Sequence, residues 1–220
     1  MASPTVENYL KAIFHLSNQL ERVTLTKVAD ELSVSAPTAN SMIKTLKQDG
    51  LVNHKKYGPI DLTPEGRKAA ALIVRKHRLT EMFLVERMFF GWEEVHAIAE
   101  QIEHIQSPQF FERMDEMLGH PQFDPHGSPI PDKDGAMHHH AFRRLSDCEP
   151  GQKLRLSAVM EAGDDFLKHL NAREIKLNTV FELLHIDSFD GSLRVDYEGH
   201  NAEVLSKMVG DRLLVVVEET

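Results

Sequence analysis

The chain has 220 residues, of which 41% are hydrophobic and 27% are charged. This composition is typical of a soluble protein with one large domain or two to three small ones. No apolar stretch approaches the roughly 20 residues that cross a bilayer, and the N-terminal segment lacks the basic and apolar regions of a secretory signal. The single cysteine, Cys148, excludes an internal disulfide framework. We therefore expect a cytoplasmic protein with no membrane partner.

The net charge of −9 hides a strong asymmetry along the chain. Residues 1–78 contain 12 Lys and Arg against 7 Asp and Glu, a balance of +5. Residues 79–220 contain 13 Lys and Arg against 27 Asp and Glu, a balance of −14. A basic N-terminal third on an acidic protein indicates a polyanion-binding module joined to something else.

Three helices and two short strands are predicted in the basic third of the chain. Apolar residues recur there at helical spacing, and Thr24 and Ser35 are good N-caps for the second and third helices. The predicted elements are helices over 4–19, 25–32 and 35–48 and strands over 51–55 and 59–62. This order is that of a winged helix-turn-helix, whose third helix enters the DNA major groove.

The third helix has an apolar stripe to bury and a polar, lysine-bearing face to expose. Such a face suits contacts with bases and phosphates, and lysines of the wing suit contacts with phosphates. The alternative is an ordinary three-helix unit with a solvated face. We predict double-stranded DNA as a partner, contacted by Ser35, Pro37, Thr38, Asn40, Ser41, Lys44, Lys47, Lys55 and Lys56.

Beyond the wing, the pattern changes twice. Helical periodicity continues first, and a segment with five of the ten prolines and three consecutive histidines then predicts a flexible loop or linker over 119–151. Period-2 segments in the remainder predict a small, mostly β domain. The expected helices cover 63–87, 92–105, 108–118 and 163–171, and the expected strands cover 153–159, 179–186, 192–197 and 213–217.

Imidazoles and carboxylates share helix faces in the central part of the chain. His77 precedes Glu81 by one turn, and His96, Glu100, Glu103 and His104 lie within about 100° of arc on a later helix. Such donors together suit a divalent transition metal. The alternatives are a solvated charged face or histidines satisfied at an interface. HExxH, P-loop and GxSxG motifs are absent, so we expect neither an enzyme nor a small organic substrate.

The motifs resemble the diphtheria-toxin-repressor family of metal-dependent transcription regulators, in its three-domain, manganese- or iron-responsive form. The resemblance covers nearly the whole chain and rests on PTVENYLKAI, SVSAPTANSMIKTLKQDGLV, LTPEGRKAA, RKHRLTEMFL, VHAIAEQIEH, FDPHGSPIP and LSDCEPGQKLRL. It implies a mainly α fold with a small β domain. The implied parts are a winged helix-turn-helix DNA-binding domain over 1–72, a helical dimerisation and metal-binding domain with its linker over 73–140, and an SH3-like β-barrel over 145–220.

Two metal sites are implied by the resemblance. The first would use Glu100, Glu103 and His104 with the side chain at position 8, which is usually an acid or methionine in the family and here is Asn8. The second would use His77, Glu81 and His96, helped by Asp124 and His126 of the linker and by Asp165 of the third domain. The three consecutive histidines at 138–140 match no metal ligand of the family.

Position 100 bears on the choice of metal. The iron-preferring branch of the family has Cys there, whereas Glu100 is a hard oxygen donor that favours Mn(II), with Fe(II) next. The resemblance thus implies a homodimeric repressor of metal-ion homeostasis, activated by Mn(II) or Fe(II) to bind a palindromic operator. The alternatives are a winged-helix regulator that ignores metal and, further behind, a metal-binding hydrolase or storage protein.

Overall fold

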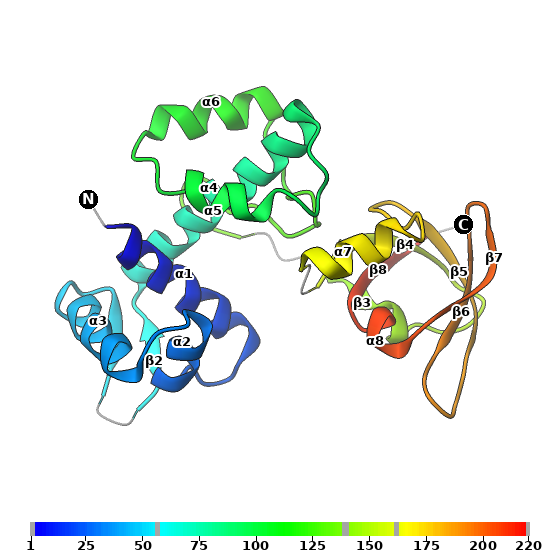
Figure 1. Ribbon diagram of the computed structural model, residues 1–220, viewed down its shortest axis with the longest axis horizontal. Helices are drawn as coiled ribbons and strands as arrows, with labels where there is room; N and C mark the ends of the chain where they lie inside the picture. Colours follow the sequence, from blue (N-terminus) through cyan, green and yellow to red (C-terminus); the bar gives the residue numbers. More distant parts are fainter. Residues whose placement is uncertain (1–2, 56–57, 138–140, 161–162, 219–220) are drawn as a thin grey trace. The chain divides into compact units, whose positions relative to one another are not determined.

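The computed structural model describes residues 3–55, 58–137, 141–160 and 163–218 (Figure 1). The chain forms two compact units, which are described separately. The first unit contains residues Met1–Thr80, Ala99–Gln122 and Ile130–His138, and the second contains Glu81–Ile98, Phe123–Pro129 and His139–Thr220. The predicted lysine at position 56 and the histidines at 138–140 lie outside the described residues.

The first unit begins with the predicted helix-turn-helix and wing. Its elements are α1 (Pro4–Gln19), α2 (Leu25–Glu31), α3 (Ala36–Gln48), β1 (Val52–His54) and β2 (Ile60–Leu62). The side chains of Ser3, Thr24 and Ser35 accept hydrogen bonds from backbone amides in the first turns of α1, α2 and α3. The strands pair antiparallel, with Val52 opposite Leu62. The winged helix-turn-helix prediction is confirmed.

The apolar faces of these helices meet in one core. Leu10 and Ile13 of α1 and Ile43 and Leu46 of α3 are fully buried in it. Gly66 lies so close to the wing that a Cβ atom there would come within 1.9 Å of the Leu51 carbonyl oxygen. The start of the next helix is therefore fixed against the base of the wing.

Three helices follow the wing: α4 (Pro64–Met88), α5 (His96–Ile102) and α6 (Pro108–Leu118). The expected helix over 92–105 begins late, because residues 92–94 form a turn in which the amide of Glu94 donates to the carbonyl of Gly91. Within the first unit, an ion pair of 2.8 Å joins Arg75 to Asp115 and so links α4 with α6. None of the helices in the described ranges has both the length and the hydropathy needed to cross a membrane.

The second unit contains a six-stranded antiparallel sheet in the order β3-β8-β4-β5-β6-β7 (Figure 1). Two short helices and a 3-10 turn, η1, accompany it. The elements are β3 (Arg143–Arg144), η1 (Leu145–Asp147), β4 (Lys153–Val159), α7 (Asp164–Asn171), β5 (Val180–Ile186), β6 (Leu193–Tyr197), β7 (His200–Leu205), α8 (Lys207–Gly210) and β8 (Leu213–Val217). Among the described residues, β3 and β7 end the sheet without pairing with each other, so the expected barrel is an open, curved SH3-like sheet.

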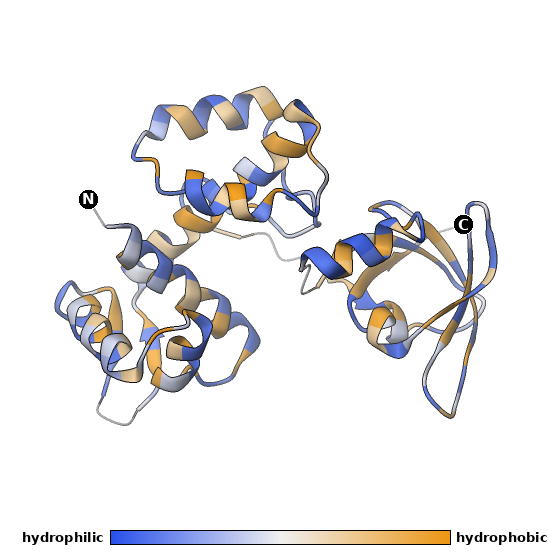
Figure 2. Cartoon of the chain, viewed as in Figure 1, coloured by the Kyte–Doolittle hydropathy of each residue, from blue (hydrophilic) through white to orange (hydrophobic). Residues whose placement is uncertain are grey.

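The core of the second unit lies on one face of this sheet. Alternate residues of β4 are buried, and apolar and polar residues alternate along the strands in Figure 2. Phe181 and Leu156 are fully buried, and Cys148 is 4% exposed in the same core. Strand β7 was missed by the sequence analysis because it is an edge strand with only Leu205 buried, so its apolar alternation is weak.

Candidate metal centres and DNA-binding face

In the first unit, polar side chains of α1 contact residues at and just after the end of α5. Glu7 is 5% exposed, and its carboxylate accepts a hydrogen bond from the Nδ1 of His104 at 2.6 Å and from the Nε2 of Gln106 at 2.9 Å. The other ring nitrogen of His104, Nε2, lies 3.8 Å from the Oε1 of Glu103 and is the nitrogen that could bind a metal ion. A carboxylate that orients an imidazole in this way is typical of metal-ligating histidines.

Glu103 is the most enclosed acid of this group, with no exposed surface. Its Oε2 lies 2.6 Å from the Nδ1 of His77, and its Oε1 lies 2.7 Å from the Nζ of Lys11. The same ammonium lies 2.5 Å from the Oε1 of Glu100, which is partly exposed. The two acids are therefore held together by one cationic side chain from α1.

Asn8 provides an independent test of whether a metal ion fits here. Its Oδ1 is buried and has no hydrogen-bond partner among the described residues. A buried amide oxygen without a partner carries a desolvation cost, and a cation would remove that cost. We define a first ligand cluster from His77, Glu100, Glu103 and His104, and we include Asn8 because it follows Glu7, which contacts His104. Oxygen and imidazole nitrogen donors of this kind suit Mn(II) or Fe(II).

In the second unit, a second ligand cluster consists of Glu81, Asp124 and His126. One ligand atom of each lies within 4.8 Å of the others, and all three residues are at most 7% exposed. The Nδ1 of His126 lies 3.8 Å from an oxygen of Glu81 and 3.9 Å from an oxygen of Asp124. These distances are too long for hydrogen bonds but allow three donors to surround one cation.

The orientation of His126 is set by backbone contacts. Its Nε2 lies 2.9 Å from the carbonyl oxygen of Trp92, so this nitrogen donates to the carbonyl and Nδ1 is the ring nitrogen nearest to the two carboxylates. The Trp92 ring stacks on the imidazole at 6.1 Å, and its Nε1 donates to Asn171 at 2.7 Å. Nδ1 and the two carboxylates together suit a divalent cation.

The linker that carries this histidine is fixed against β4. The amide of Val159 donates to the carbonyl of His126 at 2.9 Å. Gly127 has a φ of +84°, and a Cβ atom there would come within 2.1 Å of the Ser157 carbonyl oxygen. Only glycine fits such an approach without strain. The FDPHG segment is therefore ordered by the sheet.

Members of the implied second site have separate contacts in the structure. The Nδ1 of His77 lies 2.6 Å from the Oε2 of Glu103. Glu81 follows His77 by one turn, about 6 Å, along α4. His96 places its Nδ1 3.2 Å from Glu81, with most of its side chain exposed. Asp165 is exposed at the start of α7 and is not part of the second ligand cluster.

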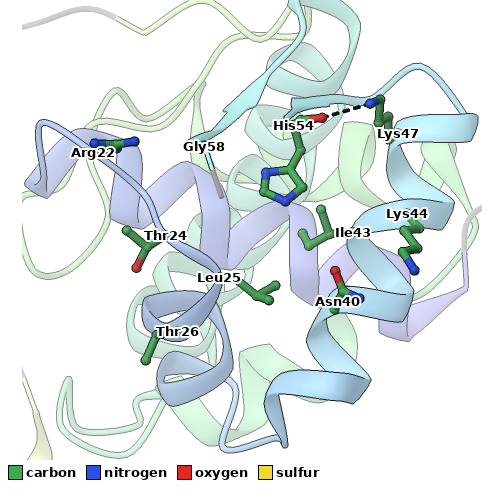
Figure 3. Close-up of a pocket in the computed structure, with 10 residues that line it drawn as sticks. All are labelled: Arg22, Thr24, Leu25, Thr26, Asn40, Ile43, Lys44, Lys47, His54 and Gly58. Carbon is green, nitrogen blue, oxygen red and sulfur yellow. Dashed lines mark hydrogen bonds between the residues drawn. The ribbon is translucent and has the colours of Figure 1, made fainter. Parts of the chain in front are cut away.

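The predicted DNA-binding residues lie on and around α3. Ser35 caps the helix, Asn40 is half-buried, and the other side chains are exposed: Pro37, Thr38, Ser41, Lys44, Lys47 and Lys55. Beside them is a hollow of about 850 Å³. Figure 3 shows that Asn40, Ile43 and Lys44 line it from α3, Thr24, Leu25 and Thr26 line it from the start of α2, and His54 lines it from β1.

Some residues of these sites were missed by the sequence analysis. Glu7 and Lys11 lie one turn apart on α1, a spacing that is detectable but not specific. Arg22 and His54 line the hollow beside α3 (Figure 3), and the carbonyl of His54 accepts a hydrogen bond from Lys47 at 2.8 Å. For Arg22, the only hint in the sequence was its positive charge in the loop before α2.

Three family models match the chain in succession. Residues 1–60 match "Iron dependent repressor, N-terminal DNA binding domain". Residues 63–132 match "Iron dependent repressor, metal binding and dimerisation domain". Residues 143–217 match the FeoA domain.

Known proteins with similar sequences and structures agree with these matches. The iron-dependent repressor IdeR of Mycobacterium leprae is 35% identical over 127 residues, which are 58% of this chain and 55% of that protein, so the chain matches about half of this relative. The diphtheria toxin repressor of Corynebacterium diphtheriae is 27% identical over 93% of both chains. A solved structure described as a manganese-dependent transcriptional repressor in complex with manganese is 33% identical, with a TM-score of 0.86 over 97% of this chain and 100% of that chain. The chain therefore belongs to the diphtheria-toxin-repressor family of iron- and manganese-dependent DNA-binding transcriptional repressors, which regulate transcription and are not enzymes.

Proposed function

We propose that this chain is a homodimeric repressor that binds a near-palindromic operator when Mn(II) or, second, Fe(II) is available. The observation that carries the proposal is the buried, unpartnered Oδ1 of Asn8. It belongs to the same helix that brings Glu7 to His104 and Lys11 to Glu103. A residue of the DNA-binding head is thus short of one interaction that a cation bound by Glu100, Glu103 and His104 would supply.

The bound metal would supply positive charge and coordination bonds to donors from both the DNA-binding head and the segment around α5. The chain's own residues do the rest. Glu7 orients His104, and His77 contacts Glu103. The first ligand cluster contains carboxylate, amide and imidazole donors and no thiolate, which favours Mn(II). We assign a second metal position to Glu81, Asp124 and His126, with His96 at its edge.

We propose that α3 reads the operator, with Asn40, Ser41 and Lys44 toward the major groove and Lys55 and Lys56 of the wing on phosphates. Two heads of a dimer must meet half-sites about one helical turn, or a multiple of it, apart. A small change in the position of α1 therefore changes DNA affinity. We retain the domain bounds 1–72, 73–140 and 145–220, which the succession of family models supports.

Fluorescence anisotropy on labelled fragments of the protein's own upstream region tests this proposal. Wild type should bind only with Mn(II) or anaerobic Fe(II) and not in chelator, and the more potent ion identifies the physiological signal. Glu103→Ala should lose the metal-stimulated binding while keeping the dimer, whereas Glu198→Ala, a change at an exposed acid of the second unit, should respond like wild type. Equal binding in chelator and in metal would contradict metal activation.

A further inference from the structure

Lys11 is the only lysine of α1, and its side chain lies among acids that the proposed metal response requires. The residue is 8% exposed. Its Nζ lies 2.5 Å from the Oε1 of Glu100 and 2.7 Å from the Oε1 of Glu103. A lysine ammonium is strongly hydrated in water, so its burial is favourable only because it is paired with both carboxylates.

The ammonium of Lys11 opposes the binding of a metal ion to Glu100 and Glu103. Two carboxylates neutralise one divalent cation, but here one ammonium already neutralises half of their charge. A metal ion that binds both Glu100 and Glu103 competes with Lys11, which already contacts one oxygen of each carboxylate. It must also tolerate a positive charge a few ångströms away in a poorly solvated region, where like charges repel strongly.

We propose that Lys11 is an internal competitor of the metal ion: it occupies Glu100 and Glu103 in the metal-free protein and sets the metal concentration at which the repressor responds. The inference rests on the proposed metal response of the first ligand cluster. Because Lys11 belongs to α1 and its two acids belong to the segment around α5, the ammonium also joins these segments before metal arrives. Metal then replaces a contact that already exists, and the affinity for metal is lowered accordingly.

Metal titration of the full-length protein tests the inference. In isothermal titration calorimetry with Mn(II) alone, Lys11→Met should bind the ion at least about tenfold more tightly than wild type, because the competing charge is gone. Lys11→Arg, which keeps the charge, should bind like wild type. Lys168→Met removes an exposed lysine of α7 and is the matched control, with unchanged Mn(II) affinity.

Loss of Lys11 leaves two acids without their ammonium, so folding must be checked separately. Lys11→Gln keeps hydrogen-bond donors without the charge and should show the same tighter binding. Both variants should have a lower melting temperature than wild type in chelator and should recover it with saturating Mn(II). Unchanged or weaker Mn(II) binding by folded Lys11→Gln and Lys11→Met would overturn the inference.

The DNA-binding assay separates this inference from the proposed function. If Lys11 is a competitor, the Mn(II) concentration that gives half-maximal operator binding should fall by the same factor as the Mn(II) dissociation constant. If wild type responds to Mn(II) and Lys11→Met responds at the same concentration, the competitor role is wrong and the proposed function stands. If wild type binds Mn(II) with no effect on DNA binding, the proposed function is wrong, and tighter Mn(II) binding by Lys11→Met would still support competition.

Discussion

Replacing the side-chain amide of Asn8 by a carboxylate tests the predicted metal response most directly. Its Oδ1 is buried and has no partner among the described residues, so a negative charge at this position would gain a full Coulombic interaction with a bound cation. We expect Asn8→Asp to tighten Mn(II) binding by at least about tenfold and Asn8→Leu to weaken it. Isothermal titration calorimetry measures both. An unchanged affinity in Asn8→Asp would remove position 8 from the metal site.

His15 gives the first unit a pH-dependent stability. Burial, together with the nearby charges of Arg78, Lys11 and His77, lowers its pKa from 6.5 to about 4, against an opposing effect of Glu100. Unfolded protein therefore binds more protons than folded protein between pH 6.5 and 4, and the stabilising contribution is present above pH 6.5 and is lost as the pH falls toward 4.

The loss attributable to His15 is at most about 3 kcal/mol. We expect the denaturation midpoint of wild type to fall more steeply between pH 7 and pH 4.5 than that of His15→Gln, because the amide cannot take up the proton. Urea unfolding followed by circular dichroism at the two pH values measures the difference between the two proteins. Parallel pH profiles would show that other groups cause the acid sensitivity.

Sequence spacing identified ligand candidates on one helix but not contacts between helices. His96, Glu100, Glu103 and His104 could be found because the expected helix over 92–105 places them on one side, although α5 ends at Ile102, before the last two. Lys11 and Glu100 are separated by 89 positions, and no local rule predicts that contact. The contact of His77 with Glu103, 26 positions away, likewise follows from tertiary packing and not from local spacing.

At the level of elements, the FDPHG linker and the turn before α5 meet at the second ligand cluster. Trp92 is the only tryptophan of the chain, its carbonyl holds His126, and its ring stacks on that imidazole. We expect Mn(II) binding at this cluster to change the intrinsic fluorescence of Trp92. His126→Ala should abolish the change, whereas His185→Ala, at an exposed position of β5, should leave it intact. A full response in His126→Ala would place the metal elsewhere.

Helices with strong caps and periodicity were predicted well, and elements shaped by distant contacts were not. The expected bounds of α1, α3 and α6 agree with the structure because Ser3 and Ser35 cap the first two and Gly119, with φ of +72°, ends the third. The start of α5 was wrong because the turn at Gly91 to Glu94 interrupts an apparently helical pattern. Strand β3 is only two residues long, too short for any alternation to be recognised.

At the scale of the whole molecule, the basic head must bind DNA as part of a chain with a net charge of −9. Local charge on α3 and the wing must therefore provide the attraction to phosphates, and salt should weaken it. We expect Lys55→Ala, at an exposed position next to β1, to reduce the slope of log affinity against log salt by about two per dimer, one for each head. Anisotropy titrations between low and moderate salt measure the slope. Lys168→Ala is the control, and an unchanged slope in Lys55→Ala would remove Lys55 from the phosphate contacts.

Cys148 lies in the core of the second unit, 4% exposed, with its Sγ directed at the carbonyl of Arg144. Burial raises the pKa of this thiol, and the protonated form is a poor nucleophile and a poor target for oxidants. It is the only cysteine of the chain. Peroxide formed alongside ferrous iron can therefore oxidise the thiol of this regulator only after the sheet opens. The folded protein is thus protected from thiol-based inactivation under the conditions in which an iron- or manganese-responsive repressor has to work.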